Sequence, residues 1–362
     1  MKILLISDMV GGPGGAYKYI GQIQDYVSDS IDICIVLDKV TEGYVSKNYG
    51  FRNVKFIPLS YKYHDQSMVI SSIDVKLDEF NPDLVHVING SIKSNLIIRK
   101  HLVQKRIPFV VTEQYIDSSL LLSEELLRDI QEINSNTDHV IYVSKSNQDI
   151  ANDVFKVKPQ VATLIYNAIL PVKDKKKIYR QQPVHFYTAA RCVPQKGIDT
   201  IIRALAKMPN SGVSFDVIGD GEYKEEYIKL ADSLLGDNNK FRILGWSEGI
   251  YYKYISDNYD LFVSASRQEG LSFSALEAAT LAMPMICSRA SGNEELMADC
   301  DCGTLFDIDN PDQLAKLMLD YISNPVVLNK KAKNGSKMVD LIFNVRRMIK
   351  DLERVYLSIT PL

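Results

Sequence analysis

Two glutamates eight positions apart stand where an apolar run, typical of a strand, passes into a helical pattern. Glu269 and Gly270 follow the run, and Glu277 falls in the first turn of a helix that we expect to begin near Ser272 or Ser274. Backbone N–H groups at the start of a helix favour anions, and carboxylates accept hydrogen bonds from sugar hydroxyls. Glu277 also has a structural explanation, because its spacing from Ser274 is that of a capping box, whereas Glu269 has no comparable one.

A basic loop, residues 190–197, lies between a predicted strand and a helix with an apolar face. Arg191 and Lys196 stand five positions apart in this loop, and Gly197 ends it. At the carboxyl edge of a sheet, the planar fork of an arginine and the point charge of a lysine can flank a diphosphate. Taken alone, the loop would be an ordinary solvated basic loop, but the two glutamates that follow favour the phosphate interpretation.

Glycines fill the loop after the first predicted strand, which ends at Asp8. Residues 11–15 read Gly-Gly-Pro-Gly-Gly and precede a helix, so a phosphate or a sugar could approach the backbone there. The alternative is a tight turn from strand to helix. A nicotinamide dinucleotide fingerprint would need a third glycine where Tyr17 stands, although Asp38 ends the second strand as that motif requires. The loop therefore argues against a nicotinamide cofactor.

Short apolar runs alternate along the chain with segments of helical period, which indicates an α/β fold with mostly parallel strands. The strands expected in the first half are residues 2–7, 31–37, 54–59, 84–88, 109–112, 139–143 and 163–166, and those in the second half are 184–189, 213–218, 241–244, 261–264, 284–287 and 304–306. Helices are expected over 16–27, 68–80, 95–103, 121–133, 198–208 and 344–357. Ligands of such sheets bind beyond the carboxyl ends of the strands, where the glycine, basic and glutamate loops lie.

A proline and a basic polar stretch, residues 171–177, interrupt this alternation and are typical of a linker. The chain has 362 residues, of which 46% are hydrophobic, and at roughly 150 residues per domain this allows two domains, each with its own core. We therefore expect one Rossmann-like domain over 1–170, a second over 171–342, and a last amphipathic helix within 343–362.

The composition excludes several classes of protein. Lysine and arginine total 42 against 45 aspartates and glutamates, and a net charge of −3 gives no basic footprint for nucleic acid. No apolar stretch approaches the roughly 18 residues of a membrane-spanning helix, and the first apolar run is far shorter than the core of a signal peptide. Five cysteines at irregular spacing fit reduced, buried thiols, so we expect a cytoplasmic protein.

Together the loops resemble the retaining glycosyltransferases of family 4, whose GT-B fold has two Rossmann-like domains facing each other across a cleft. The resemblance covers nearly the whole chain in the order of the family, and it rests on Gly14-Gly15, Asn167, Arg191 to Gly197, Gly219-Asp220-Gly221, Glu269 to Glu277, Pro284 and Glu295. A glutamate pair at this spacing arises easily by chance, but in register with the other motifs it is specific. The resemblance implies that the first domain binds the acceptor, that the second binds the donor, and that the last helix crosses back onto the first domain.

The resemblance also implies the reaction: a sugar moves with retention from a nucleotide-diphosphate donor to a glycan or lipid-linked glycan, in the synthesis of a cell-surface polysaccharide. Three residues are the catalytic candidates. Arg191 and Lys196 would take the charge of the leaving diphosphate, helped by the amides after Gly270, and Glu269 would hold hydroxyls of the donor sugar. Glu277 would hold the ribose. The further donor-binding candidates are Gly14, Gly15, Gly219, Gly270, Leu271 and Ser272. We expect neither a metal nor a cofactor, because two cations and a helix N-terminus take the place of the metal.

This chain departs from the family pattern at the end of the strand predicted over 109–112. The family often has a histidine there, near the donor sugar, whereas this chain has Gln114, which we treat as a candidate contact for the sugar or the acceptor. A second departure, Ala282 in place of a glycine, is a small change in packing. His86 lies inside a predicted strand and is better explained as a strand residue than as a catalyst.

The segment around Arg99 suggests a contact with a membrane. No acidic residue occurs between Ser91 and Thr112, and the basic residues on or beside the predicted helix are Lys93, Arg99, Lys100, Lys105 and Arg106. Such a face could rest on anionic lipid, with an ordinary solvated surface as the alternative. For the activity, two alternatives to a transferase remain: a sugar-nucleotide epimerase of the same fold, and a non-catalytic GT-B partner subunit.

Overall fold

A computed structural model describes residues 1–10, 14–60, 62–173, 175–182, 184–208, 212–236, 240–245 and 251–360. The described residues form two α/β units, each built around its own parallel sheet. Unit 1 combines Met1–Asn167 with Val345–Leu362, and unit 2 is Ala168–Asn344. The expected domain boundaries, after residues 170 and 342, lie within a few residues of these bounds.

The described strands of unit 1 form a parallel sheet in the order β3-β2-β1-β4-β5-β6-β7. They are β1 (Lys2–Ser7), β2 (Asp32–Asp38), β3 (Val54–Ile57), β4 (Leu84–Asn89), β5 (Phe109–Glu113), β6 (His139–Tyr142) and β7 (Ala162–Leu164). Every residue of β4, β5 and β6 is buried, which explains why these strands are nearly continuous apolar runs in the sequence. The strand order reverses between β1 and β4, so their carboxyl ends mark the switch point of this unit.

The helices of unit 1 connect these strands. They are α1 (Gly15–Tyr26), α2 (Glu42–Asn48), α3 (Gln66–Phe80), α4 (Leu96–Lys105), α5 (Glu124–Ser135), α6 (Lys145–Asp153) and α14 (Val345–Ile359), with a short 3-10 helix, η1 (Lys39–Thr41), before α2. Three of them begin with a side chain that accepts a hydrogen bond from the first turn: Asp65 for α3, Ser123 for α5 and Ser144 for α6. The sequence does not predict the short helices α2 and α6.

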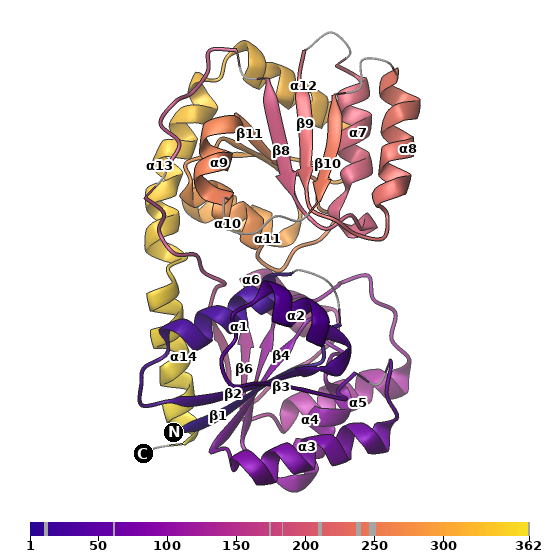
Figure 1. Ribbon diagram of the computed structural model, residues 1–362, viewed down its shortest axis with the longest axis vertical. Coiled ribbons are helices and arrows are strands. Elements are labelled where there is room, and N and C mark those ends of the chain that lie inside the picture. The colour runs from indigo at the N-terminus through magenta and orange to yellow at the C-terminus, as the bar shows by residue number, and fades with distance from the viewer. Residues whose placement is uncertain are drawn as a thin grey trace. The chain divides into compact units, whose positions relative to one another are not determined.

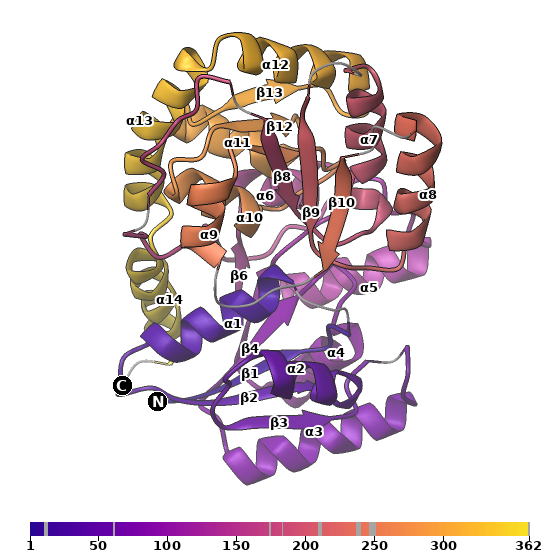
Figure 2. The same cartoon turned by 45° about the horizontal axis from the view of Figure 1, so that its top comes forward.

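The last helix, α14, packs against α1 and completes unit 1 (Figures 1 and 2). Its apolar face is buried, as the spacing predicts: Val345, Met348, Ile349, Leu352 and Tyr356. The hydroxyl of Tyr356 lies 2.7 Å from Nδ1 of His86, and Nε2 of the same ring lies 2.8 Å from Oγ1 of Thr112. Burial lowers the pKa of His86 to about 3, so its ring is neutral. His86 is therefore a strand residue that holds the last helix on the sheet.

Unit 2 repeats the pattern with a parallel sheet, whose described strands follow the order β10-β9-β8-β11-β12-β13. The strands are β8 (His185–Ala189), β9 (Ser214–Ile218), β10 (Phe241–Gly245), β11 (Leu261–Ser264), β12 (Met285–Ser288) and β13 (Thr304–Phe306). The helices are α7 (Ile198–Ala206), α8 (Lys224–Leu235), α9 (Tyr251–Asn258), α10 (Phe273–Thr280), α11 (Ser291–Cys300), α12 (Pro311–Ser323) and α13 (Val326–Ile342), with the 3-10 helix η2 (Pro194–Lys196) before α7. Each strand that the sequence predicts has a counterpart in the two sheets, and the fold class is confirmed.

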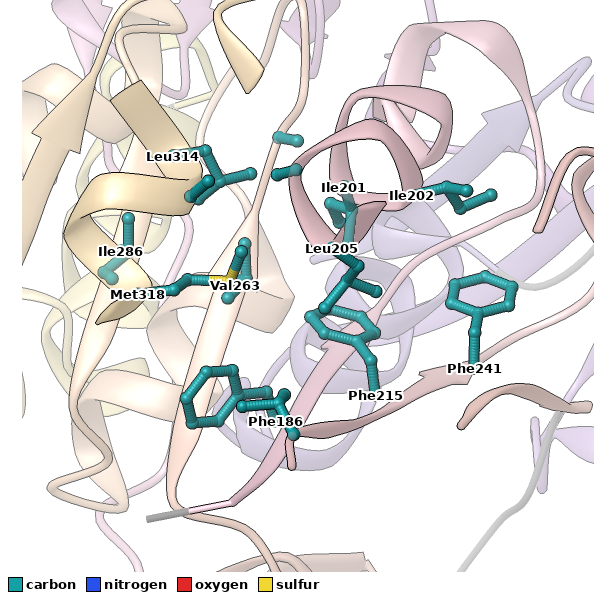
Figure 3. Close-up of a cluster of buried hydrophobic side chains, with 14 of the residues drawn as sticks. Phe186, Ile201, Ile202, Leu205, Phe215, Phe241, Val263, Ile286, Leu314 and Met318 are labelled. Carbon is teal, nitrogen blue, oxygen red and sulfur yellow. The ribbon is translucent and has the colours of Figure 1, made fainter. Parts of the chain in front are cut away.

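The core of unit 2 explains why α7 starts where it does. The residues of α7 predicted to share an apolar face, Ile198, Ile201, Ile202 and Leu205, are all buried, together with Met208 beyond the helix. They pack with Phe186, Phe215 and Val263 of the sheet and with Leu314 and Met318 of α12 (Figure 3). This packing fixes the first turn of α7, and with it the loop that precedes the helix.

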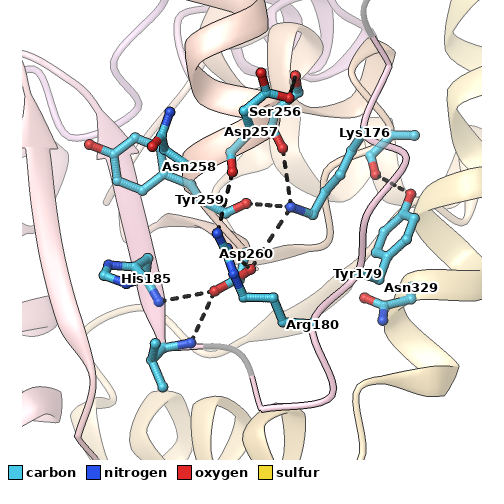
Figure 4. Close-up of polar contacts among 12 residues, drawn as sticks. Lys176, Tyr179, Arg180, His185, Ser256, Asp257, Asn258, Tyr259, Asp260 and Asn329 are labelled. Atoms are coloured by element: carbon cyan, nitrogen blue, oxygen red, sulfur yellow. Dashed lines mark hydrogen bonds and ion pairs between the residues drawn. The ribbon is translucent and has the colours of Figure 1, made fainter.

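The connection that the sequence predicts as a linker is tied to unit 2 by buried polar groups (Figure 4). Lys176 is only 4% exposed, and its ammonium donates hydrogen bonds to the carbonyls of Tyr259, at 2.5 Å, and Ser256, at 3.3 Å. Burial lowers the pKa of Lys176 to about 8, although Asp260 nearby acts in the opposite direction. Asp260 in turn accepts a hydrogen bond from Arg180. The segment is therefore a connection, as expected, but its basic residues are partly internal.

Candidate functional site

The sheet of unit 2 reverses its strand order between β8 and β11, which are neighbours although β9 and β10 lie between them in the chain. Ligands of open α/β sheets bind beyond the carboxyl ends of the strands at such a switch point. The loop after β8, residues 190–197, carries Arg191 and Lys196, and the loop after β11, residues 265–272, carries Glu269. Chain topology thus brings two of the predicted motifs to one edge of one sheet.

Lys196 and Glu269 form an ion pair at this edge. The ammonium nitrogen of Lys196 lies 2.6 Å from Oε1 of Glu269, and the two side chains are 18% and 9% exposed. The hydroxyl of Ser266 donates a second hydrogen bond to the same oxygen, at 2.7 Å. The sequence identified both charged residues but not their contact, and Glu269 has structural partners after all. The pair places one positive and one negative group side by side, where a ligand that carries both phosphate and hydroxyl groups could meet both.

Gly197 allows the two loops to approach each other. Its backbone is left-handed, with φ of 60°, and it follows η2 directly. A Cβ atom at this position would lie 2.0 Å from the carbonyl oxygen of Ala265, in the loop after β11. Only glycine fits this conformation and this contact, so the glycine of the basic loop is needed to bring Lys196 beside the second loop.

Gly219, which follows β9, packs in the same way. A Cβ atom on Gly219 would lie 1.9 Å from the carbonyl oxygen of Ala190, at the start of the loop after β8. The glycine therefore has a packing reason to be there. A contact with the donor remains a prediction for this residue.

The helix after Glu269, α10, begins at Phe273, as the sequence predicts, but Glu277 does not lie in its first turn. Ser272 is the N-cap of α10, and its hydroxyl accepts a hydrogen bond from the amide of Ala275 at 3.4 Å. The predicted capping box of Ser274 and Glu277 is wrong, because Glu277 lies in the second turn of α10, beyond reach of the N-cap. The hydroxyl of Tyr252 donates to Oε1 of Glu277 at 3.4 Å instead. The capping explanation for Glu277 is thereby removed.

Other predicted site residues lie beyond the carboxyl ends of strands in the two units. Arg191 is exposed, whereas Gly270, Leu271 and Ser272 are buried where the chain enters α10. Gly14 is the N-cap of α1 in unit 1, with an extended backbone, and Gly15 is the first residue of the helix. Residues 11–13 of the same glycine loop lie outside the described residues.

Gln114 lies directly after β5 in unit 1 and is 9% exposed. Its side-chain oxygen accepts a hydrogen bond from the side-chain amide of Asn167 at 3.0 Å, and its backbone amide donates to Asn89. The side-chain nitrogen of Gln114 has no hydrogen-bond acceptor among the described residues. The contact with Asn167 therefore fixes which end of the amide is available as a donor.

A buried polar cluster at the switch point of unit 1 escapes sequence reasoning. Asp8 and Asn95 exchange two hydrogen bonds, Asn95 donates to Asn89, and Asn89 donates to Glu113 at 2.9 Å. Burial raises the pKa of Asp8 to about 6 and that of Glu113 to about 7, although the guanidinium of Arg99 acts in the opposite direction on both. The available signal was the acidic residue at the carboxyl end of two predicted strands, where a buried charge is unusual.

Arg99 corrects the membrane prediction. The side chain of Arg99 is fully buried, 3.8 Å from Glu113, and donates to the carbonyl of Ile92 at 2.8 Å, so it cannot belong to a surface that touches lipid. The two lysines of α4 are exposed and have acidic neighbours from other helices: Lys100 lies 3.0 Å from Asp129, and Lys105 lies 3.5 Å from Asp74. The segment contains no acidic residue of its own, but acidic side chains from other elements lie beside it in the structure.

Among the described residues, no helix is both long enough and apolar enough to cross a membrane. No group of three or more histidines, cysteines and acidic residues lies together there as a candidate metal site. The five cysteines are all buried and free of disulfide bonds, as expected.

Known proteins resemble this chain in sequence and in structure. Residues 172–338 match the model of the family described as glycosyl transferases group 1. Two relatives are an uncharacterized glycosyltransferase, MJ1178, of Methanocaldococcus jannaschii, 26% identical over 61% of this chain and 60% of its own length, and the O-antigen biosynthesis glycosyltransferase WbnH of Escherichia coli, 26% identical over 78% of this chain and 80% of its own. The chain thus spans only three-fifths of the length of MJ1178.

Among solved structures, Anabaena Alr3699/HepE in complex with UDP superposes with a TM-score of 0.81 at 20% identity, over 99% of this chain and 100% of its own. At this identity the likeness establishes the fold alone. The comparisons support the expectation of a glycosyltransferase. Residues 172–338 carry the sequence pattern of glycosyl transferases group 1, and the chain as a whole has the GT-B fold.

Proposed function

We propose that this protein is a retaining glycosyltransferase that moves a sugar from a nucleoside diphosphate donor to a hydroxyl group of a glycan or lipid-linked glycan. The observation that carries the proposal is the contact between Lys196 and Glu269, 2.6 Å apart at the switch point of unit 2. A cation and a carboxylate at this place match the two halves of a nucleotide sugar, its diphosphate and its hydroxyl groups.

Each residue of the site then has a role. Lys196 and Arg191 stabilise the negative charge that develops on the departing diphosphate, together with amides at the start of α10. Glu269 accepts hydrogen bonds from hydroxyls of the donor sugar, and Glu277 from those of the ribose. Among these residues, Glu277 is supported by the loss of its capping explanation, since Ser272 and not Ser274 caps the helix.

In the proposed reaction, the bond between the anomeric carbon and the diphosphate oxygen breaks, and the acceptor oxygen forms a bond to the same face of that carbon. The proton of the acceptor hydroxyl moves to the leaving diphosphate, which departs as nucleoside diphosphate. No oxidant, reductant or second nucleophile is required. The protein positions the donor and stabilises charge, so we propose that it needs neither a metal nor a cofactor.

The donor and the pathway are part of the proposal. A UDP-sugar is the first donor to test, because a structural neighbour holds UDP. Synthesis of a cell-surface polysaccharide is proposed because the Escherichia coli relative is named for O-antigen biosynthesis. The acceptor is assigned to unit 1, where the buried side-chain amide N–H of Gln114 has no acceptor among the described residues.

Incubation with a panel of nucleotide sugars tests the proposal. Release of nucleoside diphosphate is followed for each donor, and the anomeric configuration of the product is read by NMR. Lys196→Ala is compared with Lys207→Ala, since Lys207 also pairs with a carboxylate, 2.7 Å away on Asp312, but follows the opposite end of α7. Turnover that Lys196→Ala abolishes and Lys207→Ala spares supports the transferase. Conversion of the donor sugar into an epimer would favour the epimerase, and no binding of any donor would favour a non-catalytic subunit.

A further inference from the structure

Arg267 lies between β11 and Glu269, and its guanidinium joins three loops of unit 2. One nitrogen, Nη2, lies 2.8 Å from Asp199 at the start of α7 and 2.8 Å from Asp309, after β13. Nε donates a further hydrogen bond to Asp309, at 3.0 Å. Nη1 donates to the carbonyl of Pro194, inside the basic loop. The planar fork of one arginine in the loop after β11 thus holds groups that follow β8 and β13.

The backbone around Arg267 strengthens the same connection. The amide of Arg267 donates to the carbonyl of Gln195 at 2.8 Å, and the side chain of Gln195 donates to the carbonyl of Gln268 at 3.1 Å. Gln195 and Pro194 immediately precede Lys196, and Gln268 immediately precedes Glu269. The hydrogen bonds therefore lie directly beside the two charged residues of the site.

The carbonyl of Pro194 has a second partner that links Arg267 to the shape of the loop. It accepts the amide of Gly197 at 3.1 Å and so closes η2, the turn that carries Lys196. The guanidinium of Arg267 donates to the same carbonyl oxygen. Asp309 has a left-handed backbone, with φ of 56°, and also accepts a hydrogen bond from Thr200, at 3.0 Å, on α7.

We propose that Arg267 is a positioning residue for donor binding, which holds the turn of Lys196 against the loop of Glu269 before any ligand arrives. The consequence for catalysis rests on the proposed function, but the effect of Arg267 on the turn can be tested without a ligand. Each of the three guanidinium nitrogens already contacts a carboxylate or the carbonyl of Pro194, so Arg267 acts through the loops and does not itself contact the donor. An error of about 1 Å in the placement of a reacting group can cost roughly a hundredfold in rate, which is why such a residue matters.

The test compares Arg267→Gln, Arg267→Lys and a matched control, Arg242→Gln. Arg242 makes a comparable double hydrogen bond, with both distances 2.8 Å, to Asp216, but it joins strands β9 and β10 and not the loops of the site. The first measurement is amide hydrogen exchange of ligand-free protein over residues 190–200 and 265–270. We expect faster exchange at Lys196, Gly197 and Arg267 in Arg267→Gln, an intermediate change in Arg267→Lys, and none at these positions in Arg242→Gln.

The second measurement is calorimetry with UDP, together with kcat and KM for a UDP-sugar that the wild-type protein turns over. We expect Arg267→Gln to bind UDP about tenfold more weakly and to lose about a hundredfold in kcat, with a melting temperature close to that of Arg242→Gln. Exchange that is unchanged in the ligand-free variant would overturn the inference, because any loss of UDP binding would then come from direct contact. A wild-type protein that binds no UDP, with faster exchange in Arg267→Gln, would overturn the proposed UDP donor while the positioning of the turn stood.

Discussion

Replacing Glu269 with glutamine should have opposite effects on nucleotide binding and on sugar transfer. In the ligand-free protein the carboxylate of Glu269 neutralises the ammonium of Lys196 at 2.6 Å. A diphosphate that binds Lys196 must share that ammonium with Glu269 or draw it away. Glutamine keeps the shape of the side chain and a carbonyl oxygen that Ser266 can reach, but it carries no charge. We therefore expect Glu269→Gln to bind UDP more tightly than the wild-type protein.

The size of the effect follows from the burial of the pair. Two unit charges about 4 Å apart interact by roughly 4 kcal/mol at an effective dielectric constant of about 20, and by roughly 1 kcal/mol in water. The side chains of Lys196 and Glu269 are 18% and 9% exposed, which places the pair between these limits. Part of the attraction persists in the complex, so a net gain of about 1.4 kcal/mol, or roughly tenfold in the Kd for UDP, is expected. Transfer should fall by roughly tenfold to a hundredfold, because the sugar loses a charged hydrogen-bond acceptor.

Titration calorimetry with UDP and a turnover assay with the corresponding UDP-sugar measure the two effects on one sample. Asp340→Asn is a matched control, since Asp340 also pairs with a lysine, Lys175, and also accepts from a hydroxyl, that of Thr280, but it lies on α13. Asp340→Asn should change neither the Kd for UDP nor the turnover of the UDP-sugar, except by the amount that any loss of melting temperature explains. Weaker UDP binding in Glu269→Gln, or equal losses in both variants, would refute the reasoning from the ion pair.

Five further outcomes are expected. Lys196→Ala should lower kcat by about a hundredfold with a small loss of melting temperature, and full activity in this variant would contradict the charge-stabilising role of Lys196. Treatment with EDTA should leave most of the activity. Loss of activity that manganese restores would instead show a metal site. Glu277→Gln should weaken UDP binding at an unchanged melting temperature, because Glu277 does not cap its helix; normal binding would contradict the ribose contact. Tyr356→Phe should lower the free energy of unfolding by about 1 to 2 kcal/mol in urea titration, since it removes a buried contact to His86. The stability that neutral His86 contributes should fall as the pH drops below about 6.5. The reason is that His86 of the unfolded chain takes up a proton in this range, whereas the folded ring, with its pKa near 3, does not. Parallel pH profiles of the free energy of unfolding for the wild-type and His86→Gln proteins would contradict this.

The strands were the most predictable part of the fold. Strands β4 and β11 are buried at every residue, so their sequences are short apolar runs that differ plainly from the helices beside them. The apolar face of α7 was predictable for the same reason. Helix α13 was not predicted, and it contains a glycine, Gly335, a residue type that disfavours helix interiors. In the structure Gly335 packs within a helix against Cys302, where a Cβ atom would lie 2.3 Å from the Cβ of that cysteine.

The sequence shows which charged residues are present, but not which residues they contact in the fold. The basic segment near Arg99 suggested a surface because no acid lies near it in the chain, yet Glu113 of the next strand neutralises it inside the unit. A single sequence does not say which distant acid meets which base. For the same reason Arg267 had no assigned role, although two aspartates and a proline carbonyl surround it.

The site itself depends on strand order more than on any one motif. The basic loop and the glutamate loop meet because β11 pairs with β8, after the chain has first placed β9 and β10 on the other side of β8. Neither loop encodes this pairing locally; it follows from the burial of apolar strands and helices throughout unit 2. The residues that act on a ligand are therefore visible in short motifs, whereas those that hold them in register, such as Gly197 and Arg267, can be recognised only once the loops are seen together. A variant that changes Arg267 alone separates these two kinds of residue, because it leaves every group proposed to touch the donor chemically unchanged.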